Sequence, residues 1–207
     1  MKAKLAAIFA VITWFALITQ YILMVENRST SMLETTVRFF SFFTILTNAL
    51  VAIYFTCLAL PENNRPKVIA ADGTLTAVTV YITMVGSVYQ ILLRHIWEPH
   101  GMQLVVDELL HSIVPVLVVI FWYLYESKAR IEYSQMLKWG IYPLAYLFYI
   151  LIRGHFSGFY PYHFIDVTKL GLEKTLITSV ILLLIFFAVS STFIFAGRLL
   201  YRNETQI

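Results

Sequence analysis

One histidine lies inside an apolar stretch of this chain, one helical turn after an aspartate. His111 is in the run Leu104–Tyr125, and Asp107 precedes it by four positions. Residues four apart share one face of a helix. An imidazole can take up and return a proton near neutral pH, and a neighbouring carboxylate can fix which ring nitrogen carries it. The pair predicts acid–base chemistry; the alternative for Asp107 is a helix-start carboxylate that interacts with the helix dipole.

Polar side chains also recur at helical spacing on the other apolar stretches. The sets are Thr13 and Gln20; Ser41, Thr44 and Asn48; Thr76, Thr79, Thr83, Ser87, Gln90 and Arg94; and Tyr142, Tyr146, Tyr149 and Arg153. A polar group in hydrocarbon needs a partner or water, so these stripes indicate inward helix faces. At about 1.5 Å of rise per residue, several of them fall roughly 6–10 Å below the outer surface, as His111 does. We therefore expect one shared polar layer, although hydroxyls also bond neighbouring helices simply to hold a bundle together.

The elements that must position this layer are apolar helices. Of 207 residues, 59% are hydrophobic and 13% charged, and the mean hydropathy is +0.76, which is typical of an integral membrane protein. Runs long enough to cross about 30 Å of hydrocarbon occur at Leu5–Val25, Arg38–Leu60, Ala70–Leu93, Leu104–Tyr125, Met136–Ile152 and Glu173–Arg198. We predict one all-α domain over residues 1–207, a polytopic six-helix transmembrane bundle. The short connections leave no room for a nucleic-acid-binding module.

The positive charges predict the orientation of the bundle. With the N-terminus inside, the cytoplasmic set is Lys2, Lys4, Arg65, Lys67, Lys128, Arg130, Lys138, Arg198 and Arg202, and the outer set is Arg28, Arg38, Arg94, Arg153, Lys169 and Lys174. An excess of basic residues marks the cytoplasmic side. Both termini are then cytoplasmic. The first apolar run is too long for a signal peptide, so we expect a retained helix.

Three stretches carry a more specific pattern. They are Arg38-Phe-Phe-Ser-Phe-Phe-Thr-Ile-Leu-Thr-Asn48, Leu109-Leu-His-Ser-Ile-Val-Pro115, and the run from Tyr142 through Arg153-Gly-His-Phe-Ser-Gly-Phe-Tyr-Pro-Tyr-His-Phe164. In these stretches the chain resembles the androgen-induced-protein family of membrane proteins, specifically its bacterial six-helix branch. The resemblance implies a bacterial inner-membrane protein that hydrolyses lipid esters of the fatty-acid ester of hydroxy fatty acid type, without a cofactor. It also implies a threonine nucleophile on an early helix and a histidine on a middle one.

Carried over by this resemblance, the histidine is His111, the only histidine inside a predicted helix. The nucleophile is Ser41 when the aromatic-rich start of the second helix is aligned, and Thr44 when the downstream polar residues are aligned. Thr44 matches the residue type and the depth of His111, so we prefer it, with Ser41 second and Thr47 third. A threonine hydroxyl needs a base within hydrogen-bond reach, and Asp107 is the candidate that orients this base.

Substrate binding is expected from the rest of the layer and from the segment that follows the fifth helix. Ester hydrolysis needs donors aimed at the developing oxyanion, and the aromatic stretch Gly154–Val167 could form a lid or an interfacial aromatic belt. The expected ligands are membrane lipids, a lipid ester or a fatty acid. The assigned residues are Asn48, Ser87, Gln90, Tyr146, Tyr149, Arg153 and Tyr160.

Other classes of protein remain as alternatives. A metal-dependent lipid hydrolase is one, because His95, His100, His111, His155 and His163 all fall on the outer side. Zinc needs three or four converging ligands, and no helical pair has that spacing, so we expect no metal site. A receptor, transporter or lipid-binding protein is another, although no helix looks broken at mid-membrane and no inverted repeat is visible. A non-catalytic scaffold is the last.

Overall fold

The computed structural model describes residues 1–204, and helices are the only regular elements in that part of the chain. The long ones are α1 (Lys2–Glu26), α3 (Phe43–Ala59), α5 (Thr74–Val88), α7 (Val114–Tyr125), α9 (Ile141–Ser157) and α11 (Leu172–Glu204). The shorter ones are α2 (Met32–Phe39), α4 (Lys67–Ala70), α6 (Met102–Glu108), α8 (Gln135–Trp139) and α10 (Val167–Leu170). Three 3₁₀ turns, at Glu62–Asn64, Lys128–Arg130 and His163–Ile165, lie in connections.

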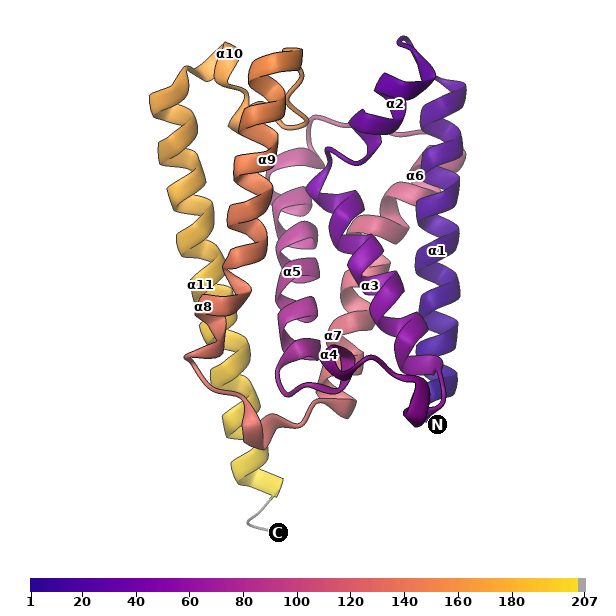
Figure 1. The fold of residues 1–207 in the computed structure, drawn as a ribbon, viewed down its shortest axis with the longest axis vertical. Helices are drawn as coiled ribbons and strands as arrows, with labels where there is room; N and C mark the ends of the chain where they lie inside the picture. Colours follow the sequence, from indigo (N-terminus) through magenta and orange to yellow (C-terminus); the bar gives the residue numbers. More distant parts are fainter. Residues whose placement is uncertain (205–207) are drawn as a thin grey trace.

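The helices form a bundle around α5 (Figure 1). Helix α1 packs along α3, and α5 contacts α3, α7 and α11. Where α1, α3 and α7 meet, Phe9, Phe55 and Phe121 pack edge to face with ring centroids 4.9–5.9 Å apart. The start of α1 and the end of α11 lie at the same end of the bundle, while α2 and α10 lie at the opposite end (Figure 1).

Four helical segments are long and apolar enough to cross a membrane: Lys2–Glu26, Thr74–Leu93, Met102–Tyr125 and Leu172–Tyr201. The pair α2 and α3 makes a fifth if it is counted as one bent span. The prediction of an all-helical chain with several membrane-length apolar helices is confirmed, whereas the number six is not. The predicted run Met136–Ile152 is divided at Gly140 between α8 and α9, and α9 has 17 residues.

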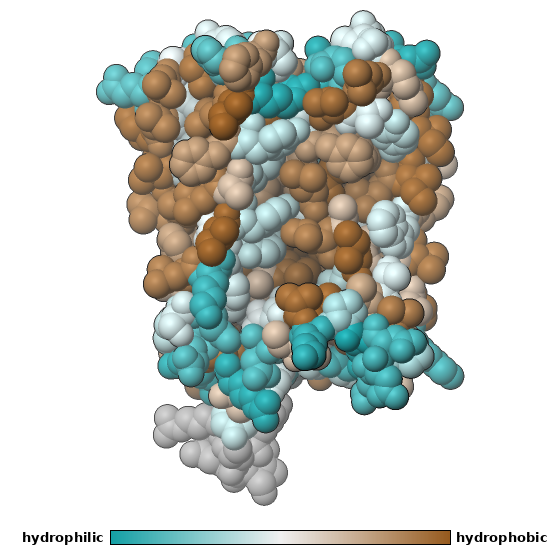
Figure 2. Space-filling view, viewed as in Figure 1, coloured by the Kyte–Doolittle hydropathy of each residue, from teal (hydrophilic) through white to brown (hydrophobic). Residues whose placement is uncertain are grey.

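The outer surface of the bundle fits an apolar solvent. In Figure 2 hydrophobic side chains cover most of the middle of the visible face, and hydrophilic ones gather toward its two ends. Large apolar side chains point outward on several helices, including Val11 (68% exposed), Phe148 (65%) and Leu184 (63%). Outward apolar residues of this size are stable where lipid replaces water, which agrees with a membrane protein.

The predicted second helix, Arg38–Leu60, is wrong as a continuous element. The chain bends by 71° between α2 and α3, so Ser41 lies in the break. A break inside an apolar bundle frees backbone groups that must find other partners. Here the Tyr146 hydroxyl donates to the Ser41 carbonyl oxygen (2.9 Å), and the Thr44 N–H donates to the Tyr162 hydroxyl (3.2 Å). The sequence pattern does not indicate this break, which lies toward the end of the bundle away from the termini.

Two other helical segments change from α-helical to π-helical winding at the same end of the bundle. Residues Tyr89–Leu93 and Leu109–Ile113 are π-helical, continuing α5 and joining α6 to α7. Pro115 has no N–H to donate to the carbonyl of His111 four positions earlier, and its ring crowds that carbonyl, which accounts for the widened turn. A Cβ on Gly86 would lie 3.1 Å from the His111 carbonyl oxygen. Glycine at this position lets α5 approach the π-helical turn closely.

Candidate functional site

His111, Asp107 and Tyr89 form one buried cluster at the two π-helical turns. The Nδ1 atom of His111 lies 2.9 Å from the carbonyl oxygen of Asp107 and 3.3 Å from its Oδ1. A carbonyl oxygen can only accept, so Nδ1 carries a proton and, in the neutral imidazole, Nε2 is the basic nitrogen. The Tyr89 hydroxyl donates to the other carboxylate oxygen of Asp107. The Tyr89 ring also stacks on His111, with centroids 4.1 Å apart.

A cavity of about 640 Å³, called here the polar cavity, lies beside this cluster. It is at the end of the bundle away from the termini. Its lining includes Tyr89, Asp107, His111, Thr44, Tyr162 and His163. The His111 side chain is 12% exposed and that of Asp107 is 6% exposed. The sequence-predicted base and its carboxylate therefore face a space that can hold a ligand.

Of the three candidate nucleophiles, only Thr44 lines this cavity. Its hydroxyl lies 3.4 Å from the Tyr162 hydroxyl. Ser41 is fully buried and donates to the Val37 carbonyl (2.7 Å). Thr47 is also fully buried, with its hydroxyl 3.0 Å from that of Tyr142. Among the described residues, none of these hydroxyls is hydrogen-bonded to His111.

Thr44 also sits at a helix start. Helix α3 begins at Phe43, so the N–H groups of its first turn have no intrahelical partner. The N–H groups of Ile45 and Leu46 turn back to the Phe42 carbonyl, and that of Thr44 reaches Tyr162 instead. A helix N-terminus carries a partial positive charge that stabilises negative charge placed beside it. The break before α3 thus places a hydroxyl and an N–H donor together in the cavity wall.

The predicted binding residues on α3 and α5 hold helices together. The Asn48 side-chain amide donates to the carbonyls of Thr44 (2.9 Å) and Leu110 (3.3 Å), while its own oxygen is buried without a partner. Gln90 donates to the Ser112 hydroxyl (2.9 Å), linking the two π-helical turns. Neither residue, nor the half-buried Ser87, lines the polar cavity or the second cavity described below.

The predicted binding residues around α9 are spread over a wider area. Tyr146 lines the second cavity, whereas Tyr149 is 39% exposed and lies 3.5 Å from the Ser41 hydroxyl. Arg153 forms an ion pair of 2.9 Å with Glu34 on α2. Tyr160 packs so closely over Gly154 that a Cβ there would lie 2.1 Å from its ring. The last two residues therefore fix α2 and the segment after α9, and neither of them lines either cavity.

Sequence reasoning missed two tyrosines that the structure places in the site. Tyr162 ends the Gly-Phe-Tyr-Pro-Tyr motif, and with Pro161 and His163 it lines the polar cavity, so part of the predicted aromatic segment does reach the site. Burial raises the pKa of the Tyr162 hydroxyl, which keeps it protonated as a donor. Tyr89 falls beside the polar stripe of its helix rather than on it. Only its contact with Asp107 across two helices reveals it.

Among the side chains that the structure describes, no group of three or more His, Cys, Asp or Glu is placed to hold a metal ion. His95, His100, His155 and His163 are exposed. In comparisons with known proteins, no family model, no curated protein and no solved structure matches this chain. The geometry of the site is therefore the basis on which a function can be argued.

Proposed function

We propose that this protein is an intramembrane hydrolase of lipid esters in which Thr44 is the nucleophile and His111 the general base. The observation that carries the proposal is that Thr44 and His111 line one cavity, with the His111 Nδ1 proton held by Asp107 and Nε2 left as the basic nitrogen. Nucleophile, base and a group that orients the base are the parts that covalent hydrolysis of an ester requires.

The proposed reaction has two steps. The Thr44 hydroxyl oxygen attacks the ester carbonyl carbon while its proton passes to His111 Nε2, directly or through one water. The tetrahedral intermediate collapses to an acyl-threonine and an alcohol that takes the proton from His111. In the second step His111 accepts a proton from water, and the hydroxide attacks the acyl-threonine carbonyl. The bond to the Thr44 oxygen then breaks, that oxygen takes the proton back from His111, and a carboxylic acid is released.

The start of α3 would supply the oxyanion donors. The Thr44 N–H and the Tyr162 hydroxyl are hydrogen-bonded to each other in the structure, and an ester oxygen that enters between them would accept from both. Donors fixed before the reaction stabilise the developing negative charge without reorganisation. The separation of Ser41 and Thr47 from the cavity supports Thr44 as the nucleophile over these two.

We further propose six membrane spans with both termini cytoplasmic, in a bacterial inner membrane. Helix α9 would be about 25 Å long at 1.5 Å per residue, and α8 extends it to Gln135. The start of α1 and the end of α11 at one end of the bundle (Figure 1) agree with an even number of spans. The polar cavity then opens toward the outer leaflet.

The test uses purified full-length protein in lipid nanodiscs, a fluorophosphonate probe and a panel of lipid esters. We expect labelling and turnover in the wild type, loss of both in Thr44→Ala and His111→Ala, and retention of both in Thr44→Ser. Ser41→Ala is the matched control, because it removes a neighbouring hydroxyl that does not line the cavity. Labelling that persists in Thr44→Ala but disappears in Ser41→Ala would contradict the assignment of the nucleophile.

The same experiment separates the alternatives. Turnover that a chelator abolishes, without probe labelling, would indicate a metal-dependent hydrolase. Saturable lipid binding with no turnover of any ester would indicate a receptor or lipid-binding protein. One observation favours a receptor or lipid-binding protein. The Thr44 hydroxyl lies 3.4 Å from that of Tyr162, and among the described residues it has no hydrogen bond to His111.

A further inference from the structure

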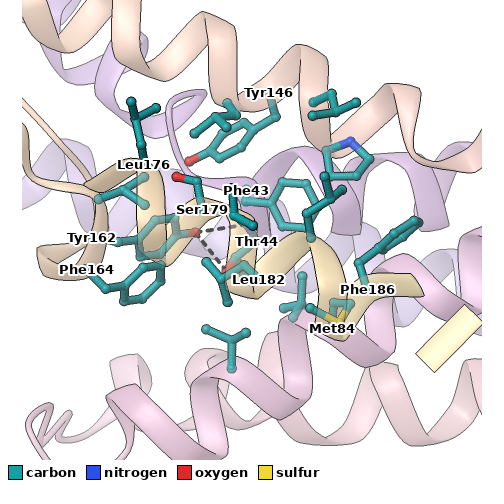
Figure 3. Close-up of a pocket in the computed structure, with 18 of the residues that line it drawn as sticks. Phe43, Thr44, Met84, Tyr146, Tyr162, Phe164, Leu176, Ser179, Leu182 and Phe186 are labelled. Carbon is teal, nitrogen blue, oxygen red and sulfur yellow. Dashed lines mark hydrogen bonds between the residues drawn. The ribbon is translucent and has the colours of Figure 1, made fainter. Parts of the chain in front are cut away.

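A second cavity of about 220 Å³, called here the apolar cavity, lies between α5, α9 and α11. Most of its lining is aliphatic or aromatic carbon, as Figure 3 shows for Met84, Leu182 and Phe186. Its few polar groups already have partners: Ser179 donates to the Thr175 carbonyl (2.7 Å) and Tyr146 to the Ser41 carbonyl (2.9 Å). A cavity whose polar atoms are satisfied offers nothing to a polar ligand and suits a hydrocarbon.

The apolar cavity meets the polar cavity at the proposed nucleophile. Thr44, Leu93 and Tyr162 line both. In Figure 3 the Tyr162 hydroxyl points toward Thr44, and dashed lines mark their hydrogen bonds. The Tyr162 ring stacks on Phe164 (centroids 5.2 Å apart), which lines the apolar cavity as well. The Thr44–Tyr162 pair therefore stands in the wall between an apolar space and a polar one.

The apolar cavity is bordered by side chains that face the surroundings of the bundle. Leu144 on α9 is 37% exposed, and Leu176 and Val180 on α11 are 45% and 56% exposed. These residues lie both on the cavity lining and on the outer surface. In a membrane, that surface contacts acyl chains, so a chain can enter between α9 and α11 without crossing water.

We propose that the apolar cavity holds one acyl chain of the ester substrate, which enters sideways between α9 and α11, while the rest of the substrate occupies the polar cavity. This assignment rests on the proposed function. The ester carbonyl then lies at Thr44, where the two cavities meet. The substrate class is an ester of a long-chain fatty acid, and the Tyr162 hydroxyl must move off Thr44 to let the carbonyl in.

The test is photolabelling with palmitic acid that carries a diazirine near its methyl end, followed by mapping of the labelled peptides. In the wild type in nanodiscs we expect labels on cavity-lining residues of α9 and α11, around Leu147 and Leu183. Ser179→Phe places a ring in the cavity. Each methylene excluded weakens binding by about fourfold, so displacement of two reduces this labelling by roughly fifteenfold. Hydrolysis should also shift toward esters of shorter acids.

Thr178→Phe is the matched control, because Thr178 is the neighbouring residue on α11 and lines neither cavity. It should leave the labelling and the chain-length profile unchanged. Labels confined to outward residues such as Ile177 and Ile181, and equal in the two variants, would overturn the proposal. If Ser179→Phe does not fold, the map of the wild type decides by itself.

The outcomes for this proposal and for the hydrolase are distinguishable. Labelling inside the apolar cavity with no turnover of any ester supports the acyl site and contradicts the proposed function. Turnover that depends on Thr44 and His111, with no labelling inside the apolar cavity, supports the hydrolase and contradicts the acyl site.

Discussion

Removal of one oxygen, in Tyr89→Phe, should destabilise the protein through Asp107. The Tyr89 side chain is buried, 4% exposed, and its hydroxyl donates to a carboxylate oxygen of Asp107. Its ring stacks on His111 with centroids 4.1 Å apart. Phenylalanine keeps the ring and its packing. The change therefore isolates the hydrogen bond between the π-helical turn Tyr89–Leu93 and α6.

The expected loss in the free energy of unfolding follows from two ranges of measured hydrogen-bond energies. A hydrogen bond to a charged group contributes about 1.5–3 kcal/mol to stability, while measured side-chain bonds between membrane helices reach about 1.7 kcal/mol. Because Asp107 lines the polar cavity, water can replace part of the lost bond. We therefore expect Tyr89→Phe to lower the free energy of unfolding by about 1.5 kcal/mol, near the bottom of the first range. This corresponds to roughly a tenfold change in the unfolding equilibrium.

The assay is a double-mutant cycle in which Tyr89→Phe and Asp107→Asn are measured singly and together by reversible unfolding in mixed detergent micelles. If the hydroxyl acts through Asp107, the two effects overlap, and the interaction energy should be about 1.5 kcal/mol. Ser87→Ala is the control on the same helix, because Ser87 lines neither cavity. An interaction energy below about 0.5 kcal/mol, the range of independent sites, would refute the reasoning.

Three further changes test other parts of the structure. Gly154→Ala should destabilise the protein by about 1–3 kcal/mol through overpacking, because the new Cβ would lie 2.1 Å from the Tyr160 ring. In thermal unfolding, the double variant Gly154→Ala/Tyr160→Ala should recover part of this loss. No recovery would contradict the contact. Asp166→Ala should cost about 1 kcal/mol, because its carboxylate accepts from the N–H two residues on at the start of α10 (3.0 Å). Burial opposes ionisation of Asp166, but hydrogen bonds from Thr168 and the charge of Lys169 outweigh it and hold the pKa below its usual value. The stabilisation by Asp166 is thus fully present above the pKa that this carboxyl has in the unfolded chain, and it is lost as the pH falls through the lower pKa of the folded protein. The free energy of unfolding should be measured against pH for the wild type and Asp166→Ala. A difference between them that is equal at acid and neutral pH would contradict this role. Glu34→Gln should loosen the segment after α9, because the Arg153 guanidinium, 9% exposed, loses its 2.9 Å ion pair. Limited proteolysis should cleave this segment faster in Glu34→Gln than in the control Glu62→Gln. The control removes a 3.5 Å ion pair between Arg65 and the exposed Glu62.

The amino-acid sequence by itself determined the helical, lipid-exposed character of the chain and the pairing of Asp107 with His111. Both depend on local periodicity, since residues four apart meet on any helix. For the same reason four of the predicted apolar runs match single helical segments, although not at their ends, while Arg38–Leu60 and Met136–Ile152 are each divided between two helices. Helix α5, for example, begins at Thr74 rather than Ala70. In its first turn the Thr76 N–H donates to the Glu126 carboxylate (2.8 Å), a contact with a residue 50 positions away along the chain.

Only the tertiary structure decided which of the three candidate hydroxyl residues lines the polar cavity together with His111. Ser41, Thr44 and Thr47 repeat at three-residue spacing, so on a continuous helix neighbouring members of the set lie only about 60° apart around the axis. The break before Phe43 separates Ser41 from Thr44, and it is held by hydroxyl groups of Tyr146 and Tyr162, more than 100 residues away along the chain. Within α3, the hydroxyl of Thr47 lies 3.0 Å from that of Tyr142, and Thr47 does not line the cavity. A backbone group freed in an apolar bundle must be satisfied by whatever side chain the fold brings to it. That condition is set by the packing of distant segments, and no pattern within one segment reports it.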